Sequence, residues 1–185
     1  REAFEALLAV LGAGDARSEV AETSVGDLDE YLAAFRAVQG AEAWRNNGAW
    51  LREHPGAVAP AVAERFRVAS EVTAEAESEA RAAVDDLRAR LHEATNDTVL
   101  IMPTVPGPAP MRTHRGERVE AVRAATLRMT TPAAIGGMPS ISIPLLTVPS
   151  SLGAAPVGVS LISRPGTDIA LVRLARRLTR AVVTS

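Results

Sequence analysis

The sequence predicts an α/β protein, in which helices flank a β-sheet, and three observations support this prediction. Residues 1–98 carry apolar side chains at helical spacing, whereas residues 99–185 hold short apolar runs that alternate with helical segments. Ten of the 12 prolines lie in the second stretch, where they mark turns and strand ends. Hydrophobic residues form 47% of the 185-residue chain, which is enough for the core of one ordinary domain. Strands alternating with helices are typical of an α/β sheet.

The N-terminal end is predicted to hold one helix and one short strand. Residues 2–11 place Phe4, Leu7 and Leu11 on one helical face. Gly12 and Gly14 follow this pattern, and we expect these two glycines to stop the helix. The alternating segment 18–22 is expected to form a short strand.

Two further helices are predicted before residue 98. Asp27 and Glu30 are spaced as a capping box, which favours a helix from there to about Leu51. From Pro60 to Leu91 apolar residues recur every three or four positions. This period predicts one long helix of roughly 50 Å, at about 1.5 Å per residue.

The C-terminal half is predicted to alternate between strands and helices. Three strands are expected, at residues 99–102, 140–144 and 156–162. The proline-rich segment 103–110 can be neither helix nor central strand, so it is predicted to be an irregular loop. Helices are expected over residues 117–135 and after Thr167, a favourable N-cap residue.

Composition excludes several kinds of chemistry within this chain. All 20 basic residues are arginine, so neither a lysine base nor a Schiff base is available. The chain has no cysteine, which removes thiolate catalysis, disulfides and cysteine-based metal sites. Residues 1–102 hold 10 arginines and 19 acidic residues, whereas residues 103–185 hold 10 and 3. We attribute this asymmetry to attraction between the two halves.

No catalytic, metal-binding or cofactor-binding residue is predicted. His54, His92 and His114 lack a second ligand at metal-binding spacing. The carboxylates between residues 75 and 86 fit a solvated helix face better than an acid/base pair. Serines such as Ser140 and Ser142 have no activating base near them in the sequence. Gly136-Gly137 is more simply a helix stop than an anion cradle.

Nucleic-acid and membrane partners are not expected. The second half has arginine clusters but no aromatic residue to stack on bases. No secretion signal is visible, and no apolar stretch reaches the length of a membrane span. We therefore expect a cytoplasmic protein, and homo-oligomerisation stays open.

Three segments of the second half resemble the C-terminal portion of amidase signature enzymes. They are residues 99–110 (VLIMPTVPGPAP), 131–144 (TPAAIGGMPSISIP) and 156–168 (PVGVSLISRPGTD). Their order and spacing also match that family. Upstream, residues 35–55 (FRAVQGAEAWRNNGAWLREHP) resemble the branch that contains plant indole-3-acetamide hydrolases and their bacterial relatives.

The resemblance implies hydrolysis of a linear carboxamide to carboxylate and ammonia by a serine nucleophile, assisted by a second serine in a cis peptide and by a lysine. No position of this chain matches those three residues. The resemblance therefore predicts the C-terminal portion of a single amidase domain, mainly helical over 1–98 and mixed over 99–185. It would form part of a large mixed sheet flanked by helices, with the N-terminal catalytic segment lying outside this chain. Alone, these residues are expected to be inactive.

The resemblance also implies a pocket wall for a small amide substrate. It places Thr104 and the helix end before Gly136 near the substrate, and Met129, Thr130 and Ala133 share one helical turn there. Packing in a helix core explains the same three residues equally well. A second function also stays open, that of a noncatalytic binding or scaffold protein that retains the amidase C-terminal architecture.

Overall fold

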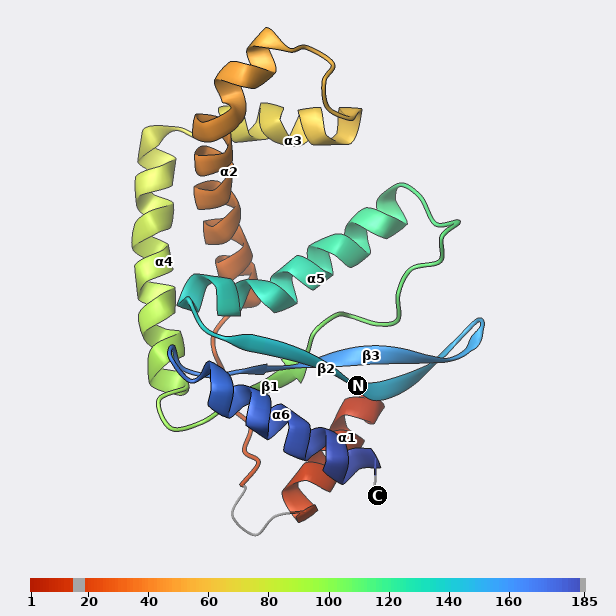
Figure 1. Ribbon diagram of the computed structural model, residues 1–185. Helices are drawn as coiled ribbons and strands as arrows, with labels where there is room; N and C mark the ends of the chain where they lie inside the picture. Colours follow the sequence, from red (N-terminus) through yellow and green to blue (C-terminus); the bar gives the residue numbers. More distant parts are fainter. Residues whose placement is uncertain (15–18, 184–185) are drawn as a thin grey trace.

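The computed structural model describes residues 1–14 and 19–183, which form helices and a small sheet (Figure 1). The helices are α1 (Glu2–Gly14), α2 (Leu28–Glu53), α3 (Pro60–Ser70), α4 (Ala74–Ala94), α5 (Glu117–Gly136) and α6 (Asp168–Val183). The strands are β1 (Leu100–Pro103), β2 (Ser140–Ser150) and β3 (Gly153–Ile162). Helices with a sheet confirm the predicted α/β class. In the described part of the chain, no helix combines the length and apolar character needed to cross a membrane.

The sheet is antiparallel, with β3 between β1 and β2. The strands β2 and β3 form a hairpin that is longer than the two predicted strands, and a register shift between Ile143 and Leu146 interrupts it. Pro144 and Pro149 lie on β2, an edge strand of this sheet, where a missing N–H costs no ladder bond on the open side. The turn at Gly153 has φ 99°, a conformation that glycine adopts without strain.

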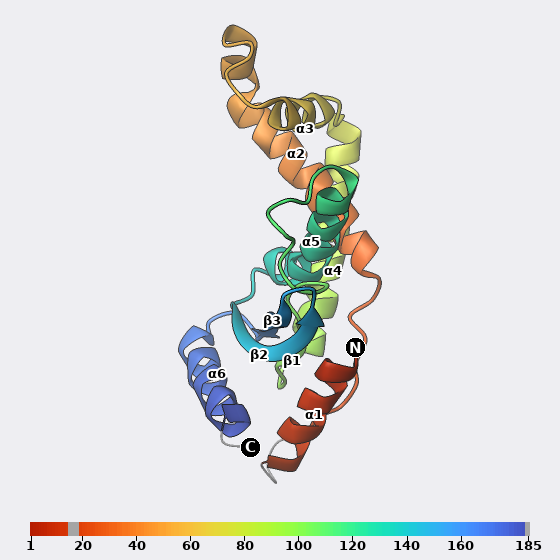
Figure 2. The same ribbon diagram turned by 90° about the vertical axis from the view of Figure 1, so that its right-hand side faces the viewer.

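The helices α1 and α6 cover one face of the sheet (Figure 2). Val157, Val159 and Leu161 of the central strand are 0–5% exposed there. They pack with Leu7 and Leu11 of α1 and with side chains of α6, in two neighbouring apolar clusters. The side chains on this face of the strands are apolar because α1 and α6 cover them.

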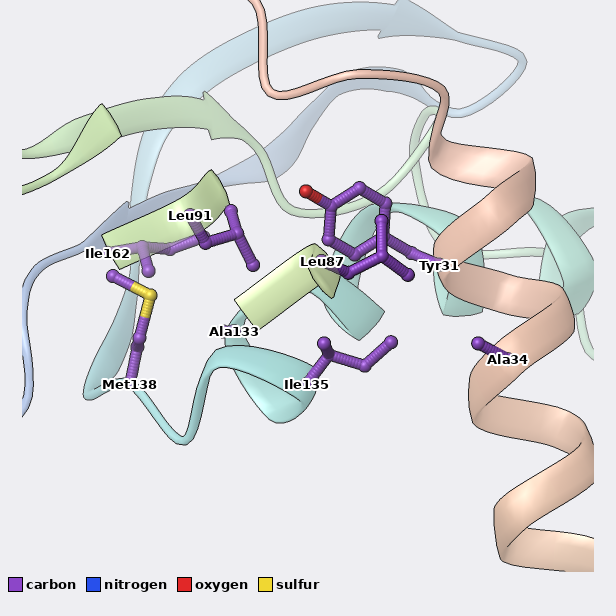
Figure 3. Close-up of a cluster of buried hydrophobic side chains, with 8 residues drawn as sticks. All are labelled: Tyr31, Ala34, Leu87, Leu91, Ala133, Ile135, Met138 and Ile162. Carbon is purple, nitrogen blue, oxygen red and sulfur yellow. The ribbon is translucent and has the colours of Figure 1, made fainter. Parts of the chain in front are cut away.

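The opposite face packs against α4 and the end of α5. We call this third cluster the helix–sheet core; its buried members are Tyr31, Ala34, Leu87, Leu91, Ala133, Ile135, Met138 and Ile162 (Figure 3). The fully buried Tyr31 donates its hydroxyl hydrogen to the carbonyl of Val25 at 2.7 Å, and burial raises the pKa of this phenol. The helix–sheet core thus joins the helical half to the sheet.

The single long helix predicted from Pro60 to Leu91 is wrong. Two helices, α3 and α4, occupy this stretch, and α3 ends at Ser70. Thr73 has extended backbone angles and accepts a hydrogen bond from the N–H of Ala76 at 3.1 Å, so it is the N-cap of α4. The apolar spacing continues across the break between the two helices, and the capping residue Thr73 is the sequence signal for the start of the second helix.

At the N-terminal end, one prediction agrees with the structure and another needs correction. The helix α1 includes Gly12 and ends at Gly14, the second of the two glycines expected to stop it. Residues 19–22 of the expected strand 18–22 form no strand, and Ser18 lies outside the described residues. The capping residue Asp27 is confirmed, although its side chain accepts from the N–H of Asp29.

Ion pairs do not support attraction between the two halves as the reason for their unequal charge. Among the described residues, most ion pairs lie within the first half; an example is Arg81 with Glu42 and Glu77. Two described pairs join the halves, Arg128 with Asp29 at 2.5 Å and Arg65 with Glu120 at 3.8 Å, and the second has the opposite polarity.

Candidate functional site

The first predicted site residue, Thr104, stands where β1 passes into the loop 104–116. Its N–H donates to the carbonyl of Gly158 at 2.8 Å, which extends the β1–β3 ladder by one residue. Side chains alternate along a strand, so Thr104 lies on the same face as Leu100 and Met102. Both of those residues pack against the helix–sheet core. Thr104 therefore faces the side of the sheet on which α5 lies (Figure 1).

Three hydroxyl groups meet on this face and form what we call the hydroxyl cluster. The Thr104 oxygen Oγ1 lies 2.7 Å from Oγ of Ser142 and 2.8 Å from Oγ of Ser160. Ser142 and Ser160 face each other across the hairpin. Ser160 is only 5% exposed, whereas Ser142 is open to solvent. Each hydroxyl carries one donor and two acceptor positions, so the cluster keeps one donor for a further partner.

Gly158 makes room for the hydroxyl cluster. A Cβ at this position would lie 2.5 Å from Oγ of Ser142 and 3.1 Å from Oγ1 of Thr104. Real Cβ atoms do not approach a neighbour as closely as 2.5 Å, so a larger residue at 158 would displace the Ser142 hydroxyl and crowd that of Thr104. Close approach of side chains, not an unusual backbone angle, makes Gly158 necessary.

The other predicted site residues lie on α5. Met129 and Thr130 are half-buried, and the Thr130 hydroxyl donates to the carbonyl of Thr126 at 3.0 Å. Ala133 is 8% exposed and belongs to the helix–sheet core (Figure 3). The structure does not place Thr104 in hydrogen-bond contact with any of these three residues.

The end of α5 is held by its own cap. Gly137 has φ 60° and ψ 36°, in the left-handed region. Its N–H donates to Ala134, and the N–H of Met138 donates to Ala133, the pattern of a Schellman motif. The glycine pair is therefore a helix stop, as predicted.

Two side chains of α4 fasten the same helix end. Arg88 donates from Nε to the carbonyl of Ile135 at 3.0 Å, and His92 lies with Nε2 2.8 Å from the carbonyl of Gly136. A carbonyl oxygen only accepts, so the Nε2 of His92 carries the hydrogen. These contacts satisfy the last carbonyls of α5, which otherwise lack partners. Its end is thus rigidly placed above the sheet.

Two surface cavities lie elsewhere. One, of about 420 Å³, lies between α2, α4 and the end of α5, with Phe35, Val84 and Ile135 among its lining residues. The other, of about 390 Å³, lies at the hairpin end of β2 and β3. Neither is lined by Thr104, Met129, Thr130 or Ala133.

Among the described residues, the serine hydroxyls that form hydrogen bonds do so with other hydroxyls or with backbone groups. No described hydrogen bond joins a serine hydroxyl to a histidine or a carboxylate, the arrangement that would activate a nucleophile. His54 instead contacts the carbonyl of Trp50 and stacks on its ring. No group of three or more histidine or acidic side chains in the described part of the chain could hold a metal ion.

The chain belongs to the amidase signature family, because the sequence pattern of the amidases matches residues 17–172. It is 29% identical over 154 residues to "Amidase 1" of Arabidopsis thaliana, covering 83% of this chain and 35% of that protein. For "Amidase 1" of Oryza sativa subsp. japonica the identity is 26% over 171 residues, with coverages of 90% and 38%. A solved amidase structure aligns with TM-score 0.80 and 28% identity, over 95% of this chain and 40% of that one.

The matches cover most of this chain but only part of each relative. The chain is matched nearly throughout, yet it spans only 35–40% of the length of the amidases that it resembles. The predicted family and fold are therefore confirmed. The sequence prediction missed Ser142, Ser160 and Gly158 as partners of Thr104. Their signal was the alternation Ser-Ile-Ser-Ile beside Gly-Val-Ser, but it needed the strand register to be read.

Proposed function

We propose that this chain is the C-terminal portion of an amidase that hydrolyses a linear carboxamide to a carboxylate and ammonia. The observation that carries the proposal is that an amidase-family chain matches only 35–40% of the length of its relatives. The described residues provide a scaffold without an activated nucleophile. The catalytic step therefore needs groups from another segment of the same amidase.

The partner of this chain is, in the same proposal, the N-terminal catalytic segment of the amidase. The sheet supports this, because β1 and β2 each pair on one side only within the described residues. Unpaired strand edges offer rows of backbone donors and acceptors to another strand. A catalytic segment that adds strands there would satisfy these groups.

The proposed pocket wall consists of Thr104, Met129, Thr130 and Ala133. Thr104 contributes a hydroxyl on the α5 side of the sheet, and Met129 contributes a half-buried apolar side chain on α5. Thr130 already donates its hydroxyl hydrogen to the helix, so toward a substrate it would offer only its oxygen. Ala133 lies at the inner edge of this wall, in the helix–sheet core. A mainly apolar wall with few polar groups suits a small amide.

The test uses the natural polypeptide that contains this chain. Its mass is measured, and ammonia release is followed for small and large linear carboxamides. We expect a polypeptide or complex much longer than 185 residues that releases ammonia. Met129→Ala should change the preference between large and small amides by about tenfold or more, whereas Leu152→Ala, at the exposed turn of the hairpin, should not.

One result would contradict the proposal and favour the scaffold alternative. In that case the natural polypeptide would have the length of this chain and would release no ammonia from any carboxamide. Binding of a small amide without turnover would then identify a noncatalytic binding protein.

A further inference from the structure

We propose that Thr104 is a positioning residue that anchors the loop 104–116 to the sheet through the hydroxyl cluster, and that this anchor sets substrate affinity. The effect on substrate affinity rests on the proposed function, whereas the anchoring of the loop does not. It adds Ser142, Ser160 and Gly158 to the residues on which the pocket wall depends.

The loop has few other attachments. After the N–H of Thr104, no described hydrogen bond joins residues 105–113 to the sheet. The bonds at its far end are local: His114 donates to Met111, and Arg115 donates to the carbonyls of Arg112 and His114. Val105 adds an apolar contact to the cluster beneath the sheet. The loop is thus attached to the sheet at its first two residues, and no further described hydrogen bond joins it to the sheet before α5.

The hydroxyl cluster makes this tie specific. Thr104 bonds to Ser142, which lies 38 positions away on β2, and to Ser160, 56 positions away on β3. One side chain therefore links the loop to two strands at once. Gly158 leaves the space that the three hydroxyls occupy, since a Cβ there would lie 2.5 Å from Oγ of Ser142. The two hydrogen bonds hold the Thr104 side chain against both strands, and one donor of the cluster is left for a further partner.

The position of the loop connects this tie to the pocket wall. The loop leaves the sheet at Thr104 and leads to the start of α5, on the same side of the sheet as that helix (Figures 1 and 2). Met129 and Thr130 lie on α5 as well. A loop released at Thr104 would move relative to these residues, and small misplacements of binding groups weaken substrate binding.

The test compares variants of the natural polypeptide. Thr104→Val keeps the shape and removes the hydroxyl, Thr104→Ser restores it, and Thr147→Val is the matched control at an exposed threonine of β2. The first readout is trypsin cleavage after Arg112 and Arg115, mapped by mass spectrometry; without lysine, this chain is cut only at arginines. The second is KM against kcat for a linear carboxamide.

We expect Thr104→Val to speed loop cleavage and to raise KM by about two- to tenfold with little change in kcat, the range for a lost hydrogen bond. Thr104→Ser should restore both values, and Thr147→Val should change neither. Ser142→Ala removes one exposed member of the cluster, so its effects on cleavage and KM should be intermediate. This variant replaces Thr104→Val in the test if Thr104→Val folds poorly.

Two results would overturn the proposal. Unchanged loop cleavage in Thr104→Val and Ser142→Ala would show that the cluster does not hold the loop. An equal rise in cleavage at all arginines, with a lower Tm, would show a general structural role instead. A natural polypeptide without amidase activity would overturn the proposed function alone, because the cleavage readout still tests the anchor.

Discussion

Ala133 is the residue at which a pocket wall and a packed core predict different outcomes. It is 8% exposed and lies among Leu91, Ile135 and Met138. Ala133→Leu adds three carbon atoms to this well-packed space, and such overpacking costs about 1–3 kcal/mol. We therefore expect a lower free energy of unfolding, measured by urea denaturation of the natural polypeptide.

The neighbouring Ala134 provides the control for that substitution. Ala134 is exposed, so Ala134→Leu should leave the free energy of unfolding nearly unchanged. If Ala133→Leu also alters kcat/KM between large and small amides, Ala133 borders the proposed pocket as well as the core. A loss of stability with an unchanged preference would give Ala133 a core role alone. A change of about 1–3 kcal/mol in that preference is the size expected for a pocket methylene.

The carboxylate of Glu77 contributes to the stability of the fold in a way that depends on pH. It accepts from Arg45 at 2.5 Å and from Arg81 at 2.7 Å, and these hydrogen bonds, first from Arg45, lower the pKa of its carboxyl. A lowered pKa in the folded state means stability that is present above the ordinary pKa of glutamate and is lost as the pH falls through the folded value.

We expect Glu77→Gln to have a lower Tm than the unmodified protein at pH 7, because the charged hydrogen bonds are lost. The difference should shrink as the pH falls below 4.5, the ordinary pKa of glutamate. Thermal denaturation over this pH range measures it, with Glu79→Gln, an exposed glutamate of the same helix, as control. A Tm difference independent of pH would contradict this role of Glu77.

At the scale of elements, Thr73 decides where α4 begins. Its side chain accepts from the N–H of Ala76, which satisfies one of the free donors at the helix start. Thr73→Ala should lower the free energy of unfolding by about 1 kcal/mol, within the usual range of about 0.5–2. Chemical denaturation measures the loss.

Ser78→Ala, at an exposed position within α4, is the control for the cap. Alanine has the higher helix propensity, so this change should not destabilise the helix. Equal losses for both substitutions would mean that the cap at Thr73 has no special weight. In that case α3 and α4 would owe their separation to packing.

The strands could be predicted from apolar spacing in the sequence, whereas the break between α3 and α4 and the hydroxyl cluster could not. The strands were predicted because Ile141, Ile143, Val157 and Val159 alternate with small or polar residues, a local pattern. The break at Thr73 was missed because the apolar residues keep helical spacing on both sides of it. The spacing alone therefore does not show that one helix ends and another begins. The hydroxyl cluster could not be predicted, since it joins residues 38 and 56 positions apart, and only the strand register brings them together.

At the scale of the whole molecule, the isolated chain is expected to associate. The strands β1 and β2 are both edges of the described sheet, and Leu152 and Ile169 are 78% and 67% exposed. Open edges and apolar surface favour contact with other chains. Light scattering should therefore detect oligomers or aggregates of residues 1–185, which disappear when the catalytic segment is present. A stable monomer that binds little hydrophobic dye would contradict this expectation.

If these residues complete an amidase whose chemistry lies in another segment, the isolated chain and the natural polypeptide should differ in activity. Ammonia release from a linear carboxamide is measured for the purified 185-residue chain and for the natural polypeptide at equal concentration. We expect turnover by the natural polypeptide and none by the isolated chain. Turnover by a homogeneous preparation of the isolated chain, abolished by a serine-directed reagent, would contradict it.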